Sequence, residues 1–270
     1  MESKLSRSSV ELAVSTNPGE TRLEKQVVSA DTPAEAPAVL RREDRSSRGF
    51  LVRMGKRLVT RLLPASFRKR LQRLEPKARP IYLRLMTVDR FRGGLTRRRA
   101  PAGARSFVAV CFGNIMRSPM VELMMKRAVS ARGLRDLKIC SAGLHATAGR
   151  EAHPWALEVS RSLGLSLEKH RAQLLTDEMV ERADAILAMD MENLAELLAR
   201  YPAARNRIFM LGAYAEGRQC GRAIPDPYFG DVEETRRCYV TLQACVENLV
   251  STLSADRQPE VPEHKGTFGR

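Results

Sequence analysis

From about Ser106 onward, short apolar runs alternate with helical patterns, and this alternation is the feature that most constrains the fold. The first run, residues 107–110, is continuously apolar, which is typical of a strand that is buried on both faces. Alternating strands and helices predict a parallel sheet with helices on both faces and with ligands outside the carboxyl ends of the strands. We therefore expect residues 106–253 to form an α/β domain on a single doubly wound parallel four-stranded sheet with flanking helices.

Apolar periodicity and turn residues assign the elements of this domain. The expected strands cover residues 107–110, 137–140, 185–188 and 207–210. The expected helices cover residues 119–132, 154–163, 178–182, 191–200 and 232–253.

The positive charge of the chain is confined to the part that precedes this domain. Of the 270 residues, 46 are Lys or Arg and 31 are Asp or Glu, which gives a formal net charge of +15. Residues 1–105 contain 25 basic and 10 acidic groups, whereas the remaining residues contain 21 of each. The excess charge therefore belongs to an extension of a neutral domain.

The regions outside the domain differ from one another in composition and in the spacing of their apolar residues. Residues 1–44 are polar and lack periodicity, so we predict a disordered tail, and we expect a second disordered tail at residues 254–270. Residues 45–105 are predicted to be a basic amphipathic extension and linker, partly helical, because apolar residues recur at helical spacing among arginines. Pro64 should interrupt this helical pattern, and Pro76 and Pro80 should break the chain again.

Composition also bears on the compartment. There is no run of about 18 apolar residues and no apolar segment after the first residues, so we expect neither a transmembrane helix nor a secretory signal. Five cysteines without paired spacing favour a reducing compartment, and hence a cytoplasmic location. The basic amphipathic extension, residues 45–105, suits an anionic membrane surface, so a peripheral position at the inner face of the membrane is one hypothesis. Nucleic acid is the alternative partner, which scarce aromatic residues disfavour.

The candidate site lies where the first expected strand meets the first expected helix. Cys111 ends the strand, and Arg117 follows it six residues later. Gly113 and Asn114 tolerate left-handed backbone angles, which a loop needs if its N–H groups are to turn inward. Ser118 suits the N-cap of the helix that follows.

This arrangement predicts an anion site that contains a nucleophile. Loop N–H groups and a helix N-terminus that point at one spot bind anions, and the same field favours the thiolate form of Cys111. Arg117 can hold two phosphoryl oxygens as a planar fork. A nucleophile inside a phosphate cradle indicates covalent phosphoryl transfer.

Residues 111–119 resemble the signature loop of the low-molecular-weight protein tyrosine phosphatases, and the similarity continues through most of residues 106–253. Asp226-Pro227-Tyr228, about 115 residues after the loop, resembles the general-acid motif of that family. Residues 1–105 have no counterpart in its single-domain members. Further similar segments are Ser141-Ala142-Gly143, His170-Arg171-Ala172-Gln173 and Ala188-Met189-Asp190.

The resemblance implies a phosphotyrosine protein phosphatase that hydrolyses phosphate monoesters with no metal and no cofactor. It makes Cys111 the nucleophile, Arg117 the ligand of the phosphoryl oxygens and Asp226 the general acid. The implied substrate is a tyrosine-phosphorylated protein, in bacteria often a tyrosine kinase of polysaccharide export. The resemblance further implies substrate- or phosphate-binding roles for Phe112, Gly113, Asn114, Ile115, Met116, Ser118 and Tyr228, and supporting roles for His170 and Ser141.

Several other residues of the domain are assigned to structure rather than to catalysis. His145 and His153 are expected at the surface or in loops, and Asp190 is expected to have a structural role in its loop. Cys238 and Cys245, seven residues apart on the last helix, share a face and are expected in the core.

The loop departs from many members of the family at Met116, where a second cysteine would stand near the nucleophile. Methionine cannot form the protective disulfide, so peroxide should inactivate the enzyme without that reversible route unless Cys140 or another thiol substitutes. Two related activities stay open. An arsenate reductase needs further thiols, and residues 176–200 contain none, whereas phosphoarginine phosphatases tend to carry a smaller polar residue in place of Ile115.

Overall fold

The computed structural model describes residues 64–89 and 94–255. The predicted tail at residues 1–44, the first part of the basic extension and most of the predicted C-terminal tail lie outside the described residues. Within the described part, no helix is both long enough and apolar enough to cross a membrane.

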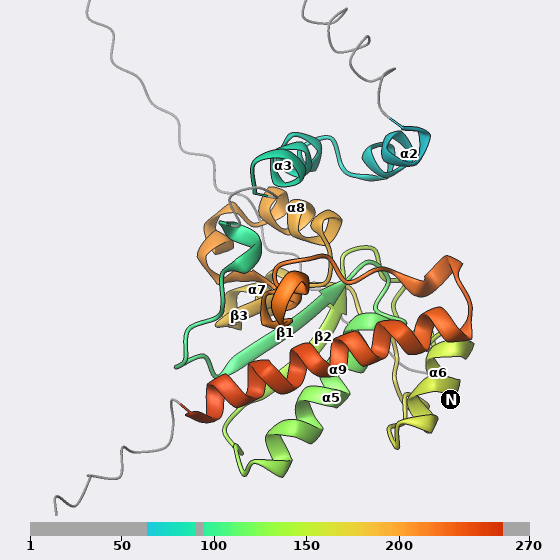
Figure 1. The fold of residues 1–270 in the computed structure, drawn as a ribbon, viewed down its shortest axis with the longest axis vertical. Helices are drawn as coiled ribbons and strands as arrows, with labels where there is room; N and C mark the ends of the chain where they lie inside the picture. Colours follow the sequence, from blue (N-terminus) through green and yellow to red (C-terminus); the bar gives the residue numbers. More distant parts are fainter. Residues whose placement is uncertain (1–63, 90–93, 256–270) are drawn as a thin grey trace, which may run out of the picture. The chain divides into compact units, whose positions relative to one another are not determined.

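The centre of the fold is a parallel sheet of four strands, as predicted: β1 (Ser106–Cys111), β2 (Lys138–Gly143), β3 (Ala185–Ala188) and β4 (Ile208–Met210). Their order is β2-β1-β3-β4, so β1 pairs with β2 on one side and with β3 on the other (Figure 1). The chain therefore changes direction across the sheet at β1. In doubly wound sheets this switch point opens a crevice at the carboxyl ends of the strands, and Cys111 is the last residue of β1.

Alternate residues of β1 face two different apolar layers. Phe107 and Ala109 pack with α5 (Arg117–Ala131), α6 (Pro154–Ser162) and α9 (Val232–Ala255), and Figure 1 shows α9 lying along α5. Val108 and Val110 pack with α7 (Asp177–Arg182) and α8 (Met191–Arg200) on the opposite face. The predicted helices and strands are thus confirmed, with ends that differ by at most three residues.

The described part of the basic extension also joins this core. It contains α2 (Ala65–Arg73), α3 (Ala78–Arg84) and the π-helical turn η1 (Leu85–Asp89). Pro64 is the N-cap residue of α2, and the helical pattern that it should interrupt lies outside the described residues, so the interruption stays a prediction. The prediction that Pro80 breaks the chain is wrong, because Pro80 lies in the first turn of α3, where its missing N–H has no intrahelical partner to lose.

Apolar side chains of the extension are buried on the face of the sheet that α8 covers. Leu74, Ala78, Tyr82 and Leu85 belong to the same buried cluster as Leu194 of α8. Residues 98 and 99 also touch the domain, since Arg98 Nη2 donates to the carbonyl of Asn206 (2.8 Å) and Arg99 Nε to that of Ala213 (3.2 Å). The domain boundary at residue 106 stays a prediction, but the packed region begins before it. The remaining short helices are η2 (Leu95–Arg97), η3 (Pro202–Arg207), η4 (Leu211–Tyr214), η5 (Gly217–Gln219) and η6 (Pro227–Phe229).

Candidate active site

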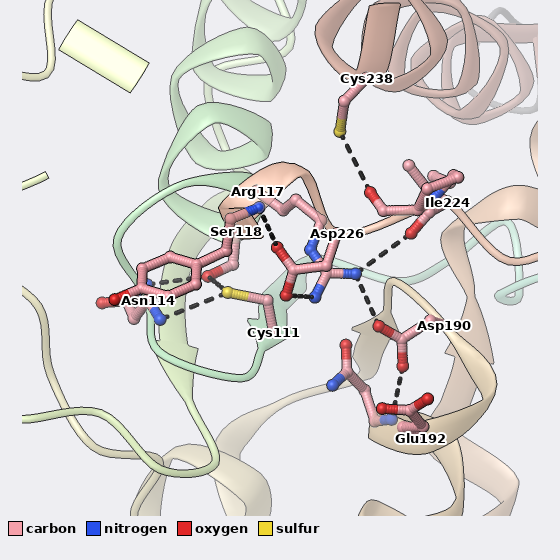
Figure 2. Close-up of polar contacts among 12 residues, drawn as sticks. Cys111, Asn114, Arg117, Ser118, Asp190, Glu192, Ile224, Asp226 and Cys238 are labelled. Carbon is pink, nitrogen blue, oxygen red and sulfur yellow. Dashed lines mark hydrogen bonds and ion pairs between the residues drawn. The ribbon is translucent and has the colours of Figure 1, made fainter. Parts of the chain in front are cut away.

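The loop between β1 and α5 encloses the thiol of Cys111. Cys111 is 3% exposed, its Sγ lies 3.0 Å from the hydroxyl oxygen of Ser118, and it accepts the backbone N–H of Asn114 at 3.3 Å (Figure 2). The N-terminus of α5 begins at Arg117, so the unpaired N–H groups of its first turn belong to the same loop. The thiol therefore lies where backbone N–H groups and the positive end of the helix dipole would attract a bound anion.

Asn114 fixes the shape of this loop. It has a φ of 54° and is the one non-glycine residue with positive φ in the part of the chain that the structure describes. Its side-chain Nδ2 donates to Ser118 Oγ (2.9 Å) and to Ser141 Oγ (3.0 Å), and its Oδ1 accepts from the backbone of Gln173 (3.0 Å). A left-handed residue persists where its surroundings over-determine it, and three hydrogen bonds do so here.

Two of the predicted supporting residues lie behind the loop rather than in the pocket. His170 Nε2 lies 2.7 Å from the backbone carbonyl oxygen of Asn114. Ser141, on β2, links Asn114 to Glu122 of α5, because its hydroxyl donates to the Glu122 carboxylate at 2.6 Å. His170 therefore contacts the backbone of the loop and Ser141 contacts the Asn114 side chain, while their supporting roles stay a prediction.

The end of β2 approaches the loop so closely that it must be glycine. Gly143 pairs with Cys111 across the sheet. A Cβ at this position would come within 2.8 Å of the Phe112 carbonyl oxygen and 2.9 Å of the Asn114 nitrogen. Real Cβ contacts essentially never reach such distances, so Gly143 is a requirement of the loop that composition and periodicity do not reveal.

The guanidinium of Arg117 is held between two carboxylates. Arg117 is 1% exposed; its Nη1 donates to Asp190 Oδ2 (2.6 Å) and to the Ile224 carbonyl (3.1 Å), and its Nη2 donates to Asp226 Oδ2 (2.5 Å). Burial alone would lower the pKa of Arg117, but the charges of Asp190, Asp226 and Cys111 raise it above the ordinary arginine value. The buried arginine is therefore a permanent cation beside the thiol.

Two expectations about this region change with the structure. Ser118 is not the N-cap of α5, because the helix begins at Arg117 and the Ser118 hydroxyl lies beside Cys111 and 3.2 Å from the Ala142 carbonyl oxygen. Asp190 does have a structural role, since Oδ1 accepts from Asn193 N and caps α8, but it also binds Arg117. Its position two residues after the end of β3, the strand next to β1 in the sheet, is the signal that could have identified it as a site residue.

A pocket of about 720 Å³ opens above the loop. Cys111, Arg117 and Asp226 all line it, the first two buried and Asp226 partly exposed. The aromatic side chains of Phe112 and Tyr228 also line it. Tyr228 packs edge-on against Phe229, whose ring is 77% exposed, with ring centroids 4.9 Å apart. Of the residues that sequence predicts in the site, the pocket lining includes Cys111, Phe112, Gly113, Ile115, Met116, Arg117, Asp226 and Tyr228, but not Asn114, Ser118, Ser141 or His170.

The two histidines near the pocket have structural partners. His145 stacks on Phe112 (ring centroids 4.6 Å apart) and lies 2.6 Å from the Glu196 carboxylate. His153 caps α6, because its Nδ1 accepts the backbone N–H of Trp155 at 3.3 Å. Burial and the charge of Arg150 lower the pKa of His153, which keeps the ring neutral and able to accept that bond.

Among the described residues, one cluster has the spacing of a metal site. The ligand atoms of Glu75, His145 and Glu196 lie within 4.8 Å of one another. The guanidinium of Arg200 contacts all three, at 2.5, 3.3 and 3.5 Å respectively, so a fixed cation already neutralises these acids. The cluster fits an ion-pair network better than a metal centre.

The five cysteines are all free thiols, and two have the core positions predicted for them. Cys238 and Cys245 are buried on α9. Burial raises the pKa of Cys238 to about 12 and that of Cys245 to about 11. Both therefore remain protonated at neutral pH and are poor nucleophiles.

A thiol at the base of a loop that joins a central parallel strand to a helix, with a buried arginine and a carboxylate above it, is the arrangement of the cysteine-dependent phosphatases. Residues 106–259 match the family model described as "Low molecular weight phosphotyrosine protein phosphatase", and the chain belongs to that family.

Similarity to individual proteins covers the same region. The chain is 37% identical over 151 residues to the probable low molecular weight protein-tyrosine-phosphatase EpsP of Ralstonia nicotianae, covering 56% of this chain and 97% of the relative. It is 33% identical over 149 residues to the phosphatase Etp of Escherichia coli K12, covering 55% and 95%. Among solved structures, the YwlE arginine phosphatase from Geobacillus stearothermophilus is 27% identical with a TM-score of 0.50, covering 56% of this chain and 94% of that one.

Proposed function

We propose that the protein dephosphorylates phosphotyrosine in proteins, with Cys111 as nucleophile, Arg117 as phosphate ligand and Asp226 as general acid and base. The observation that carries this assignment is the convergence of the three side chains on one pocket. The Cys111 thiol accepts or shares hydrogen bonds with Asn114 and Ser118, while Arg117 Nη2 lies 2.5 Å from Asp226.

In the first step the Cys111 thiolate attacks phosphorus in line, and an S–P bond forms while the bond from phosphorus to the phenolic oxygen breaks. Loop N–H groups and Arg117 bind the equatorial oxygens, where charge accumulates. A phosphoryl group in the loop competes with Asp226 for Nη2 of Arg117, which leaves the acid to protonate the departing phenolate. The Tyr228 and Phe112 rings form the apolar wall for the tyrosine ring.

In the second step Asp226 takes a proton from water, and the water oxygen attacks the phosphocysteine. The S–P bond breaks, inorganic phosphate leaves, and the electron pair returns to sulfur. Ser118, 3.0 Å from Cys111 Sγ, stabilises the departing thiolate with its hydroxyl. The net reaction consumes one water molecule and regenerates the thiolate.

Hydrolysis of p-nitrophenyl phosphate by the full chain tests these roles. Cys111→Ser should abolish turnover, and Asp226→Ala should lower kcat by about 10²–10⁴-fold. Cys220→Ser and Asp136→Ala are matched controls outside the pocket lining and should keep wild-type rates. An unchanged rate in Cys111→Ser would end the assignment.

Phosphoarginine is the second candidate substrate, and the likeness to a solved arginine phosphatase supports it. Ile115, which lines the pocket and is buried, favours phosphotyrosine because it adds apolar surface where a guanidinium would need polar partners. Phosphotyrosine and phosphoarginine versions of one peptide distinguish the two. We expect wild type to prefer phosphotyrosine and Ile115→Thr to narrow that preference; faster phosphoarginine hydrolysis by wild type would reverse the assignment.

The physiological substrate class that we propose is a tyrosine-phosphorylated protein of the cytoplasm, with a bacterial tyrosine kinase as the main candidate. The basic extension, residues 45–105, would hold the enzyme at an anionic membrane surface. Co-sedimentation of the full chain with vesicles that contain phosphatidylglycerol, against vesicles of phosphatidylcholine alone, tests this location. Equal pelleting with both would contradict it, and binding to an oligonucleotide instead would favour nucleic acid.

A further inference from the structure

The basic extension contributes two arginines to the mouth of the active-site pocket. Arg70 and Arg73 of α2 both line the pocket that contains Cys111. They are three residues apart, so they lie on the same face of the helix. Arg70 Nε lies 3.6 Å from the carboxylate of Glu192, and the guanidinium of Arg73 lies 5.3 Å from the centroid of the Phe229 ring.

The contacts of α2 with the domain hold this helix end in place. Leu74, the residue after α2, is 3% exposed, and Phe67 of α2 packs its ring against Tyr82 of α3 at 5.7 Å. Glu75 accepts from Arg200 Nε of α8 at 2.9 Å. Because an apolar anchor and an ion pair flank the C-terminal turn of α2, Arg70 and Arg73 have a defined position relative to the pocket.

The charge at this rim is only partly neutralised. Glu192 pairs with Arg70, and Glu196 is already bound by His145 and Arg200. Arg73 and Arg150, which also lines the pocket, form no ion pair with a carboxylate in the described part of the chain. Both guanidiniums lie over aromatic rings, Arg73 over the exposed Phe229 and Arg150 over the half-buried Tyr228.

From this arrangement we propose that Arg70 and Arg73 form a specificity rim that binds acidic residues next to the phosphotyrosine of the substrate. The inference rests on the proposed function. A phosphotyrosine that reaches Cys111 brings its sequence neighbours to the pocket mouth, where forked guanidiniums bind carboxylates in a bidentate manner. The rim belongs to the extension, so the preference for acidic flanks is a property of this chain's α2 and not of the domain alone.

The test compares two phosphotyrosine peptides of equal length with the full chain. One has Asp and Glu on both sides of the phosphotyrosine, and the other has Asn and Gln at the same positions. The measured quantity is the ratio of kcat/KM for the acidic peptide to that for the amide peptide. We expect a wild-type ratio of about ten, expressed mainly in KM and decreasing as salt is added, because partly exposed charge pairs are screened.

Substitutions at Arg70 and Arg73 test whether these two residues cause the preference for the acidic peptide. R70A/R73A should bring the ratio to about one, and R70E/R73E should take it below one, because the ratio follows the charge at the rim. R70K/R73K should give an intermediate ratio, because lysine keeps the charge but not the planar fork. Lys69→Ala is the matched control, since Lys69 lies on α2 but does not line the pocket, and it should keep the wild-type ratio. A wild-type ratio of one, or an equal fall in Lys69→Ala, would overturn the proposal.

A failure of the rim differs from a failure of the proposed function. If wild type hydrolyses p-nitrophenyl phosphate but does not distinguish the peptides, only the rim is wrong. If wild type hydrolyses neither p-nitrophenyl phosphate nor the peptides, the phosphatase assignment fails. The rim is then tested by the ratio of the affinities of the acidic and the amide peptide for the Cys111→Ser chain. Equal affinities in that measurement overturn the rim as well.

Discussion

Arg117 Nη1 and Asp190 Oδ2 lie 2.6 Å apart, and this ion pair joins the first residue of α5, which follows β1, to the N-cap residue of α8, which follows β3. The two strands are neighbours in the sheet, and the crevice between their loops is the switch point of the fold. Asp190 also caps α8 through its other carboxylate oxygen. One side chain therefore holds both the start of α8 and the arginine that we propose as the phosphate ligand, which is the kind of preorganisation that catalysis requires.

Asp190→Asn should separate the two roles of this residue. Asparagine can still cap α8, but it leaves the buried Arg117 with Asp226 as its one carboxylate partner. We expect the free energy of unfolding to fall by about 1–3 kcal/mol and kcat/KM for p-nitrophenyl phosphate to fall by about 10–100-fold. Urea unfolding and steady-state kinetics measure these effects. The exposed Asp136→Asn is the control, and equal behaviour of the two variants would refute the role of Asp190.

The architecture could be predicted because local patterns and global fold agree in this domain. Residues 107–110 are apolar without interruption, and β1 is indeed paired on both edges and covered on both faces. Cys111 and Arg117 could be placed in one site because a strand–helix turn brings them together without any long-range contact. Asp226 could be placed there only through the resemblance to a family, because no periodicity indicates which loop meets which.

Long-range packing decided what the sequence left open. Serine is a residue type that helix N-caps favour, yet Ser118 lies inside the first turn of α5. Its hydroxyl contacts the Cys111 thiol instead, because the loop in front of α5 takes its shape from Asn114. The amphipathic pattern of the extension predicted helices but not their partner. Tyr82 and Leu74 pack in one buried cluster with residues of α8. No property of residues 64–89 alone could indicate that contact.

Peroxide should inactivate the wild-type enzyme irreversibly, and one substitution, Met116→Cys, should make the inactivation reversible. Met116 is in the loop of Cys111, and burial keeps Cys238 as a thiol with its pKa raised to about 12. Cys140 packs with the cluster on the opposite face of the sheet from Cys111. The sulfenic acid formed at Cys111 by peroxide therefore has no suitable thiol partner and proceeds to irreversible acids.

Met116→Cys should restore reversibility, because a thiol then stands in the same loop as the nucleophile. After equal exposure to peroxide, dithiothreitol should recover most of the activity of Met116→Cys and a minor part of that of wild type. Met116→Leu is the control without a thiol. Mass spectrometry identifies the Cys111 product. A mapped disulfide from Cys111 to any native cysteine, with full recovery of wild type, would contradict the prediction.

Stability should depend on pH through Asp184, which joins the starts of β1 and β3. Its carboxylate accepts the backbone N–H groups of Arg105 and Ser106, both at 2.9 Å, and the Ser106 hydroxyl at 2.8 Å. The Arg105 N–H, followed by the Ser106 hydroxyl, holds the pKa of Asp184 below its usual range. The stabilisation is complete above the unfolded-state pKa, about 4, and is lost as the pH falls through the lower folded-state pKa.

Asp184→Asn should therefore lower the free energy of unfolding by about 1 kcal/mol at pH 7, a value that allows for the exposure of the carboxylate. The difference from wild type should shrink as the pH is lowered below about 4, because wild-type Asp184 is then protonated. Urea unfolding at several pH values measures it, with the exposed Glu181→Gln as control. A difference that grows toward low pH would have the wrong sign.

Gly143→Ala tests whether the close approach of β2 shapes the loop around the nucleophile. A methyl group there would meet the Phe112 carbonyl at 2.8 Å and the Asn114 nitrogen at 2.9 Å, both backbone atoms of the loop. The loop must shift, so kcat for p-nitrophenyl phosphate should fall by about 10–100-fold, with a loss of about 1–3 kcal/mol in unfolding free energy. Gly103→Ala is the matched control, because nothing lies within 4 Å of its added Cβ. Gly143 is the register partner of Cys111 in the sheet. An unchanged kcat in Gly143→Ala would mean that the loop keeps its shape without support from β2.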